Sequence, residues 1–471
     1  MSEGVDLLSH RATNARRNAL SICLASLALL GVVMVAVSCS LGGSITAPVT
    51  RPSPSPGLPV RSKTPQPTVT VQPTPTVFGL TLPVTLTIWL PPDMALSAQS
   101  GGQALQEANE SFETANPGIF IEIVPKAAYG AGGLANALIA TRPVVPSRLP
   151  DIIAIDTAQA DVLVAQGLLV PLDDLLPGSI WQDLYPSAAT AISSTELGAG
   201  VSAIAARRYA IPFQVDIGFV AYNTSNIPLA PRTWTDMEGL EVKYVFPASQ
   251  GAGDAADAFL LQYLAEGGEL LSEGGRPYLD SAIVARVLTV YRQAVDAGVV
   301  PITVRNLQTV QDCWDAYMQD KATMTNVSSW LYQRERSALR RTRYAPIPTT
   351  SGVSSTLARS WSWAIVTDDP IRQQIASQYI LAVLSPHALA SWCSQSYHLP
   401  AHRAAMALVI EDESYRTFLE ELLKNAHPYP DLSYYTGLQS IIIRAIEDVL
   451  DGVSTPERAA VTAAAMVARL R

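Results

Sequence analysis

Short apolar runs alternate along the chain with longer segments in which apolar residues recur at helical spacing. The runs at 84–90, 119–124 and 151–156 read VTLTIWL, IFIEIV and DIIAID, and their β-branched residues are typical of buried strands. A helical segment separates the first two runs and ends at residues 116–118, NPG, which form a strong stop signal. Strands and helices in this alternation predict a parallel sheet with helices on both faces.

The pattern continues after an unusually long predicted strand at 210–223, AIPFQVDIGFVAYN. The other predicted elements are helices at 255–266, 282–297, 310–319, 371–384 and 440–470, the last broken at 451–452, and short strands at 322–325, 344–347 and 363–366. Ligands of such sheets bind beyond the carboxyl ends of the strands, so residues 89–93 and 156–159 are expected at the functional edge.

The first 39 residues have the layout of a secretory signal. Arg11, Arg16 and Arg17 precede an uncharged apolar run at 19–37. At ~1.5 Å per residue this run could also cross a bilayer as an uncleaved helix. Both interpretations place the rest of the chain outside the cytoplasm.

A cysteine directly after the apolar run favours lipid attachment. The stretch 36–39, AVSC, resembles a bacterial lipobox, although Ala36 stands where leucine is usual. We therefore predict Cys39 as the lipid attachment site, with ordinary cleavage or an uncleaved anchor as alternatives. Residues 40–77 form the predicted linker, because 46–76 hold nine prolines and seven threonines and almost nothing to bury.

Composition narrows the classes of function. The chain has 471 residues, of which 48% are hydrophobic and 15% charged, which is too apolar for a disordered protein. Its 32 basic and 41 acidic residues argue against a nucleic-acid surface. Five histidines and four cysteines are too dispersed for a zinc ribbon or a disulfide framework. Cys313 and Cys393 are expected as two separate buried thiols.

The common local signatures of enzymes are missing. The sequence holds no HExxH, GxSxG or P-loop motif, and its two GxGxxA strings, at 130–135 and 251–256, are interpreted as loops before helices. His398 and His402 have i,i+4 spacing, but Pro400 lies between them. We predict no catalytic residue, no metal and no cofactor. A pair of glycosidase carboxylates has no fixed sequence spacing, so an extracellular carbohydrate-active enzyme stays an alternative.

The tryptophans suggest sugar-ring contacts. Trp89 ends a predicted strand, Trp330 follows a strand and a turn, and Trp361 alternates with Trp363. Core packing is the usual role of tryptophan, but several at loop edges would form flat platforms for sugar rings. The run 334–343, with five arginines, is interpreted as a solvated helix face, with an anionic ligand or a partner contact as the alternative.

Several stretches carry a family resemblance when taken in order. The opening ones are LTIW, FETANPGIFIEIV and PDIIAIDTAQADVLVAQGLLVPLDDLL, and the most specific is YAIPFQVDIGFVAYN at 209–223, followed by PRTWTDM. YMQDKATMTNVSSW at 317–330 keeps Lys321 but has Asp320 where glycine is usual, and YAPIPTTSG, WSWAIVTDD, YHLPAHRAA and DGVSTPERA follow. Together they resemble the family 1 extracellular solute-binding proteins of ABC importers, which include the maltose-binding type.

The resemblance implies an α/β, two-lobed periplasmic-binding-protein-like fold of type II, whose discontinuous lobes are joined by a hinge. Lobe 1 would comprise residues 78–210 plus 346–395, and lobe 2 residues 211–345 plus 396–471. Ligand would lie between the lobes. The implied ligand-binding residues are Trp89, Asp156, Gln214, Asp216, Trp330, Trp361 and Tyr397.

The implied function is that of the extracytoplasmic substrate-binding component of an ABC importer. Its expected partners are a carbohydrate ligand, the permease subunits and, through a lipid anchor, the cell membrane. The protein is expected to be a monomer with no nucleic-acid partner. Besides the carbohydrate-active enzyme, a ligand sensor that reports to a membrane kinase is an alternative.

Overall fold

The computed structural model describes residues 76–77, 80–81, 83–96, 101–191, 207–251 and 253–470. The predicted signal at 1–39, with Cys39, and nearly all of the linker at 40–77 lie outside these residues. Within the described part of the chain, no helix combines the length and the apolar character needed to span a membrane.

A mixed sheet runs through the described residues, with the strand order β4-β3-β5-β10-β6-β8-β7. Strands β9 and β11 pair with β6, β12 pairs with β10, and β1 and β2 form a separate hairpin. The strands are β1 Thr76–Val77, β2 Leu80–Thr81, β3 Val84–Leu90, β4 Ile119–Pro125, β5 Ile152–Asp156, β6 Ile211–Asn223, β7 Tyr244–Val245, β8 Met324–Ser328, β9 Thr342–Ala345, β10 Leu357–Ile365, β11 Leu399–Pro400 and β12 His427–Pro428.

The direction of the strands corrects part of the sequence analysis. Strand β3 pairs in parallel with β4 and β5, as predicted. Strand β10, however, lies antiparallel to both β5 and β6, and β6 lies antiparallel to β8. The sheet is therefore mixed: β3, β4 and β5 are parallel, and the two long strands β6 and β10 pair antiparallel to one another.

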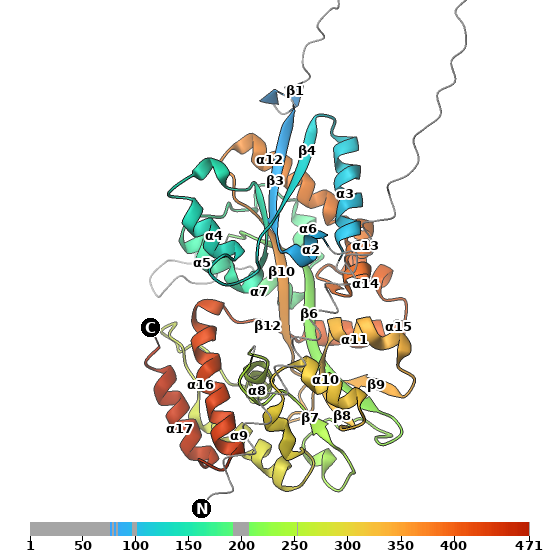
Figure 1. The fold of residues 1–471 in the computed structure, drawn as a ribbon, viewed down its shortest axis with the longest axis vertical. Helices are drawn as coiled ribbons and strands as arrows, with labels where there is room; N and C mark the ends of the chain where they lie inside the picture. The colour runs from blue at the N-terminus through green and yellow to red at the C-terminus, as the bar shows by residue number, and fades with distance from the viewer. Residues whose placement is uncertain are drawn as a thin grey trace, which may run out of the picture. The chain divides into compact units, whose positions relative to one another are not determined.

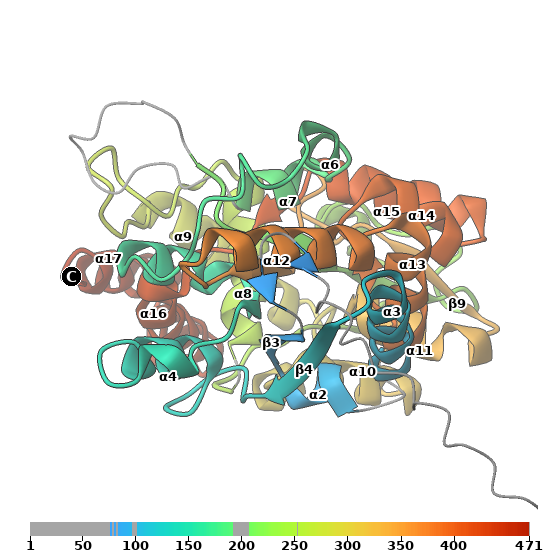
Figure 2. The ribbon, with the colours of Figure 1, turned by 90° about the horizontal axis from the view of Figure 1, so that it is seen from above.

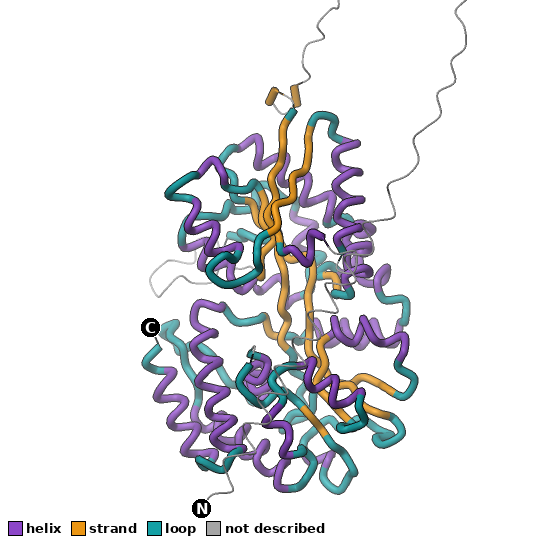
Figure 3. Tube along the Cα trace, viewed as in Figure 1, coloured by secondary structure: helices purple, strands orange, loops and turns teal. Residues whose placement is uncertain are grey.

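Two lobes share these two long strands (Figures 1 and 3). In β6, Ile211 and Phe213 belong to the core of the first lobe, whereas Val220 belongs to a core of the second. In β10, Trp363 packs in the first core and Leu357 in the second. The chain therefore passes between the lobes within paired strands. The lobe boundaries given above stay a prediction.

Helices pack on the sheet in both lobes. The α-helices are α2 Pro92–Leu96, α3 Gly102–Ala115, α4 Leu134–Thr141, α5 Ala160–Ala165, α6 Gly178–Gln182, α7 Pro186–Ala191, α8 Asp254–Ala265, α9 Ser281–Asp296, α10 Val310–Met318, α11 Ser329–Glu335, α12 Pro370–Val383, α13 Pro386–Ser396, α14 Arg403–Val409, α15 Glu413–Lys424, α16 Leu432–Leu450 and α17 Pro456–Val467. In the first lobe α12 contacts α3, α13, β3 and β10 (Figure 2). In the second, α8, α9, α16 and α17 share one core.

Local signals explain where several helices begin and end. Asp280 accepts a hydrogen bond from Ala282 N at 2.7 Å and so begins α9. Thr309 and Asp312 form a capping box at the start of α10. The carboxyl end of α3 lies at Asn116, where the stop signal was predicted. Side-chain caps of this kind satisfy N–H groups that a helix leaves unpaired.

The two body cysteines are separate buried thiols, as predicted. Cys393 lies in the core of the first lobe, and Cys313 packs with Val245 and Ala322. Burial raises the pKa of both thiols well above the ordinary value.

An ion pair joins the sheet of the first lobe to α12. Asp151, at the start of β5, is 4% exposed and accepts hydrogen bonds from Arg372 Nε at 2.6 Å and from Thr87 N of β3 at 2.8 Å. We expect Asp151→Ala to lower the free energy of unfolding by about 2–4 kcal/mol, because it leaves a partly buried guanidinium and a strand N–H without their acceptor. Urea denaturation followed by circular dichroism measures the change.

The matched control is Asp296→Ala. Asp296 pairs with Arg292 across one turn of α9, and both side chains are exposed. Such a pair contributes about 0.3–0.5 kcal/mol, so this variant should unfold close to the wild-type midpoint. Equal losses in the two variants would contradict a special role for the Asp151 pair.

Candidate functional site

Three neighbouring strands bring four of the predicted ligand-binding residues together. In the register of β10, Trp361 lies opposite Asp156 of β5 on one side and Gln214 of β6 on the other. Two residues earlier, Arg359 lies opposite Asp216 of β6. The end of β5 and the middle of β6 therefore present their polar side chains around one short stretch of β10.

Asp156 is fully buried and closely surrounded by donors. Its carboxylate accepts hydrogen bonds from Tyr129 OH at 2.6 Å, from Arg359 Nε at 2.9 Å and from Ala158 N at 3.1 Å. Arg359 also donates from Nη2 to Tyr129 OH at 3.1 Å. A buried carboxylate needs such partners because an unpaired charge away from water is costly.

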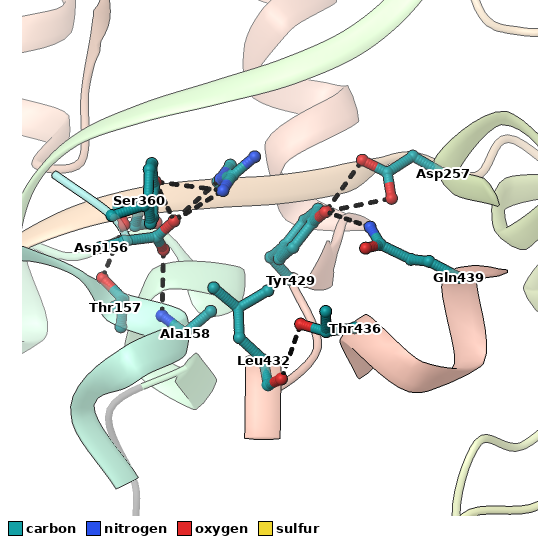
Figure 4. A network of polar contacts seen from close by, with 11 residues as sticks. Asp156, Thr157, Ala158, Asp257, Ser360, Tyr429, Leu432, Thr436 and Gln439 are labelled. Atoms are coloured by element: carbon teal, nitrogen blue, oxygen red, sulfur yellow. Dashed lines mark hydrogen bonds and ion pairs between the residues drawn. The ribbon is translucent and has the colours of Figure 1, made fainter. Parts of the chain in front are cut away.

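The guanidinium of Arg359 also links this cluster to the second lobe. The Cζ atom of Arg359 lies 4.7 Å from the centre of the Tyr429 ring. Tyr429 directly follows β12, the strand that pairs with β10. The hydroxyl of Tyr429 donates to Asp257 of α8 at 3.0 Å and accepts from Gln439 Nε2 at 3.3 Å (Figure 4). Side-chain contacts of Asp156, Arg359, Tyr429 and Asp257 thus connect β5, through β10, to α8.

Asp257 carries a shifted pKa. Tyr435 OH donates to its carboxylate at 2.7 Å, in addition to Tyr429. Burial raises the pKa of Asp257 to about 6, and the two tyrosine hydroxyls and the nearby Arg359 only partly oppose this rise. The group therefore titrates close to neutral pH.

A cavity of about 250 Å³ opens beside these contacts. We call it the main cavity for its position there, not for its volume. Its charged lining residues are Asp216, Asp254, Asp257 and Arg359, and Tyr429 supplies an aromatic ring. Its other lining residues are Ile217, Gly218, Pro247, Ala258, Leu261, Val310, Asn326, Val327, Ser328, Ile347 and Leu357. Most of these residues come from β6, α8, β8 and β10, so the cavity lies on the second lobe and on the shared strands.

The other predicted residues lie at varying distances from this cavity. Asp216 lines it and accepts a hydrogen bond from Trp330 N at 2.9 Å. The ring of Trp330 is covered by Arg334, whose guanidinium lies 4.4 Å from the ring centre. Gln214 is 1% exposed and accepts from Trp392 Nε1 at 2.7 Å.

Trp89 and Tyr397 are not brought to this group. Trp89 is 5% exposed in the core of the first lobe, with Lys126 Nζ 4.8 Å from its ring centre. Tyr397 is 37% exposed at the end of α13, in the left-handed conformation. The ligand-binding roles of all seven predicted residues stay a prediction.

The weaker motifs have local explanations. Gly133 and Gly253 begin α4 and α8, so both glycine-rich strings are loops before helices, as predicted. His402 is buried with Nε2 2.9 Å from Pro212 O. In the described part of the chain, no three acidic, histidine or cysteine side chains form a group suited to a metal ion. The arginine run is not one helix, because α11 ends at Glu335 and β9 begins at Thr342.

Sequence reasoning missed Arg359, Tyr129, Asp257 and Tyr429. For Arg359 a signal was present, since it continues the period-two pattern of Trp361 and Trp363 towards the amino terminus. Asp257 is an acidic residue among the buried apolar residues of α8. Tyr129 and Tyr429 lie in connecting segments without periodicity, where no pattern marks them.

Comparison with protein families decides the identity. The profile of the bacterial extracellular solute-binding protein family matches residues 107–415, about two thirds of the chain. The chain belongs to this family. The match includes β4, β5, β6 and β10 and therefore the strands that carry Asp156, Asp216 and Arg359.

Solved solute-binding proteins share the two-lobed fold. The cyclic alpha-maltosyl-1,6-maltose binding protein of Arthrobacter globiformis superposes with a TM-score of 0.68 at 16% identity, over 82% of this chain and 98% of that one. Maltose-bound MalE3 of T. maritima superposes with a TM-score of 0.63 at 18% identity, over 82% of this chain and 99% of that one. The GacH receptor of Streptomyces glaucescens, solved unliganded and with acarbose, superposes with a TM-score of 0.60 at 17% identity, over 83% of this chain and 100% of that one. Comparison with curated proteins finds no match.

In this solute-binding protein, the shifted pKa of Asp257 gives a pH-dependent stability. The pKa of an aspartate in an unfolded chain is about 3.9, so the folded protein holds this proton more tightly. The contribution of Asp257 to stability is therefore largest below pH 4 and is lost as the pH rises to 6 and above. We expect the free-energy difference between wild type and Asp257→Asn to change by about 1–3 kcal/mol between pH 4 and pH 7.

Urea unfolding at a series of pH values measures this difference. Asp296→Asn, at an exposed position of α9, serves as the control and should run parallel to wild type. If Asp257→Asn also runs parallel to wild type, Asp257 titrates normally in the folded protein.

Proposed function

We propose that this chain is the extracytoplasmic substrate-binding component of an ABC importer and captures a sugar or oligosaccharide at the main cavity. The observation that carries the proposal is the cavity itself, which is lined by carboxylates, a guanidinium and a tyrosine. Two of these groups, Asp216 and Arg359, lie on the strands shared by the two lobes. The solved proteins of similar fold are named for binding maltose, a cyclic maltosyl-maltose or acarbose, which supports a saccharide ligand.

The lining suits the two chemical faces of a sugar. Asp216 and Asp254 offer carboxylate acceptors for hydroxyl groups, and Asn326 offers an amide. Leu261, Ile347 and other apolar side chains provide surface for the C–H face of a ring. Few polar groups among many apolar ones are typical of a small-molecule site.

Ligand capture would act on the balance between open and closed lobes. Strands β6 and β10 cross between the lobes, and Arg359 on β10 contacts Asp156 of the first lobe and Tyr429 of the second. A ligand that contacts this arrangement better in the closed state shifts the population towards closure, which the permease then recognises. Identical X-ray scattering from the free and the saturated protein would contradict closure as the signal.

The localisation belongs to the same proposal. The family is extracellular. We propose export through the signal at 1–39, lipid attachment at Cys39, and a proline-rich stalk that holds the binding lobes near the permease. The protein would act as a monomer and without catalytic turnover of its ligand.

Titration of tryptophan fluorescence with mono- and oligosaccharides tests the function. We expect a saturable change with at least one saccharide, and chromatography should recover that saccharide intact. In Arg359→Ala the affinity should fall about tenfold or more, because a charged hydrogen-bonding group is lost from the cavity and Asp156 loses its partner.

Arg292→Ala, which removes an exposed arginine of α9, is the matched control and should bind as wild type does. A response to no saccharide would contradict the proposed function. Recovery of cleaved sugar would favour the carbohydrate-active enzyme instead.

A further inference from the structure

The main cavity has an excess of negative charge. Three aspartates, Asp216, Asp254 and Asp257, line it, and Arg359 is the one basic residue among its described lining residues. The lining alone would leave two carboxylates without a counter-charge.

Arg359 compensates these three carboxylates only in part, because it is paired with a fourth carboxylate outside the lining. Its Nε and Nη2 both lie 2.9 Å from Asp156 Oδ2, and Asp156 is fully buried. A buried carboxylate requires such a partner. The charge of Arg359 still lowers the pKa of Asp254 and of Asp257, but one guanidinium shared among four carboxylates leaves the cavity with an excess of acidic groups.

Two of the aspartates each keep one oxygen available. Asp216 Oδ1 accepts from Ser329 Oγ and from Trp330 N, and Asp254 Oδ2 accepts from Val310 N at 2.8 Å. The second oxygen of each has no hydrogen-bond partner among the described residues. Protein groups therefore hold both side chains in place and leave acceptor capacity for a ligand.

Asn326 gives an independent indication of a ligand. It lines the cavity, is 7% exposed, and its Oδ1 accepts from Tyr244 OH at 2.5 Å. Its amide nitrogen has no acceptor within the described part of the chain. This nitrogen is not among the wholly buried polar atoms without a partner, so water in the cavity can reach it. An occupant that displaces this water is expected to supply an oxygen in its place.

The cost of desolvation favours a positively charged occupant. Closing a neutral ligand over uncompensated carboxylates removes water from charges that nothing else balances. A protonated amine at the available oxygens would offset this cost through charge-assisted hydrogen bonds. Burial raises the pKa of Asp254, and the N–H of Val310 and the charge of Arg359 only partly oppose this rise.

We propose that the natural ligand is a saccharide that carries a protonated amine, an amino sugar or a saccharide with an amine-bearing residue. The amine would lie between Asp216 and Asp254, and a ring or hydroxyl oxygen would accept from Asn326. This inference rests on the proposed function and names the class of its substrate.

The test compares saccharides in matched pairs. The full chain in detergent is titrated by calorimetry with glucosamine and glucose, with the β-1,4-linked glucosamine disaccharide and cellobiose, and with acarbose and maltotetraose. In at least one pair, the amine-bearing saccharide should have an affinity about tenfold higher than its neutral counterpart, or more. This is the gain expected from one charge-assisted hydrogen bond.

A variant then locates the effect. In Asp254→Asn the side-chain oxygen can still accept from Val310 N, while one negative charge is removed. Because Asp254 also accepts from hydroxyl groups, both affinities should fall, but the affinity for the amine-bearing saccharide should fall about tenfold more than the affinity for the neutral counterpart. Asp174→Asn, at an exposed position outside the lining, is the matched control and should bind as wild type does.

The outcomes separate this inference from the proposed function. Neutral saccharides that bind as tightly as their amine-bearing counterparts would overturn the inference and leave the proposed function standing. Absence of binding to any saccharide would overturn both. The comparison within wild type needs no variant, so a fold defect in Asp254→Asn, visible as a lowered melting temperature, does not weaken the test.

Discussion

The pairing of Asp156 with Arg359 is the interaction on which the candidate site depends. Asp156 ends β5 without any exposed surface, and Arg359 beside it on β10 supplies the charged partner that a buried carboxylate needs. The same pairing fixes the guanidinium against Tyr429, which in turn holds Asp257 of α8. One ion pair thus connects the sheet of the first lobe to the binding lining of the second.

This connection also determines the charge of the cavity. Because the guanidinium is paired with a carboxylate outside the lining, it compensates the aspartates that line the cavity only in part. A carbohydrate site can use carboxylates as acceptors for hydroxyl groups, but uncompensated charge at a closing interface favours a cationic group on the ligand. Family membership defines the type of protein, and the balance of charge in the cavity bears on its substrate.

The sequence predicted the strands that are apolar throughout and missed features created by pairing between distant segments. Strands β3, β4, β5 and β6 match their predicted ranges to within one residue, since each is rich in β-branched and other apolar residues. Strand β10 begins at Leu357, six residues before the prediction, because small buried serines alternate with its large side chains. Helices α13, α14 and α15 were not predicted, although α15 buries an amphipathic stripe that includes Leu419 and Leu423.

The site was predictable in part for the same reason. Asp156 ends a recognisable strand, so its placement followed from the rule that ligands meet strand ends. Asp216 lies within β6, and only the family resemblance pointed to it. Arg359 lies in the unpredicted half of β10, and Tyr129 and Tyr429 reach it from connecting segments that carry no periodic signal. The strand register and the side-chain contacts of the folded protein show that these three residues meet.

A crystal structure with the saccharide selected by titration would test the central claim most directly. The account predicts that the saccharide lies in the main cavity, in contact with Asp216 or Asp254, while Arg359 remains paired with Asp156. A saccharide bound elsewhere, for example between Trp89 and Trp330 with the main cavity filled only by water, would contradict it.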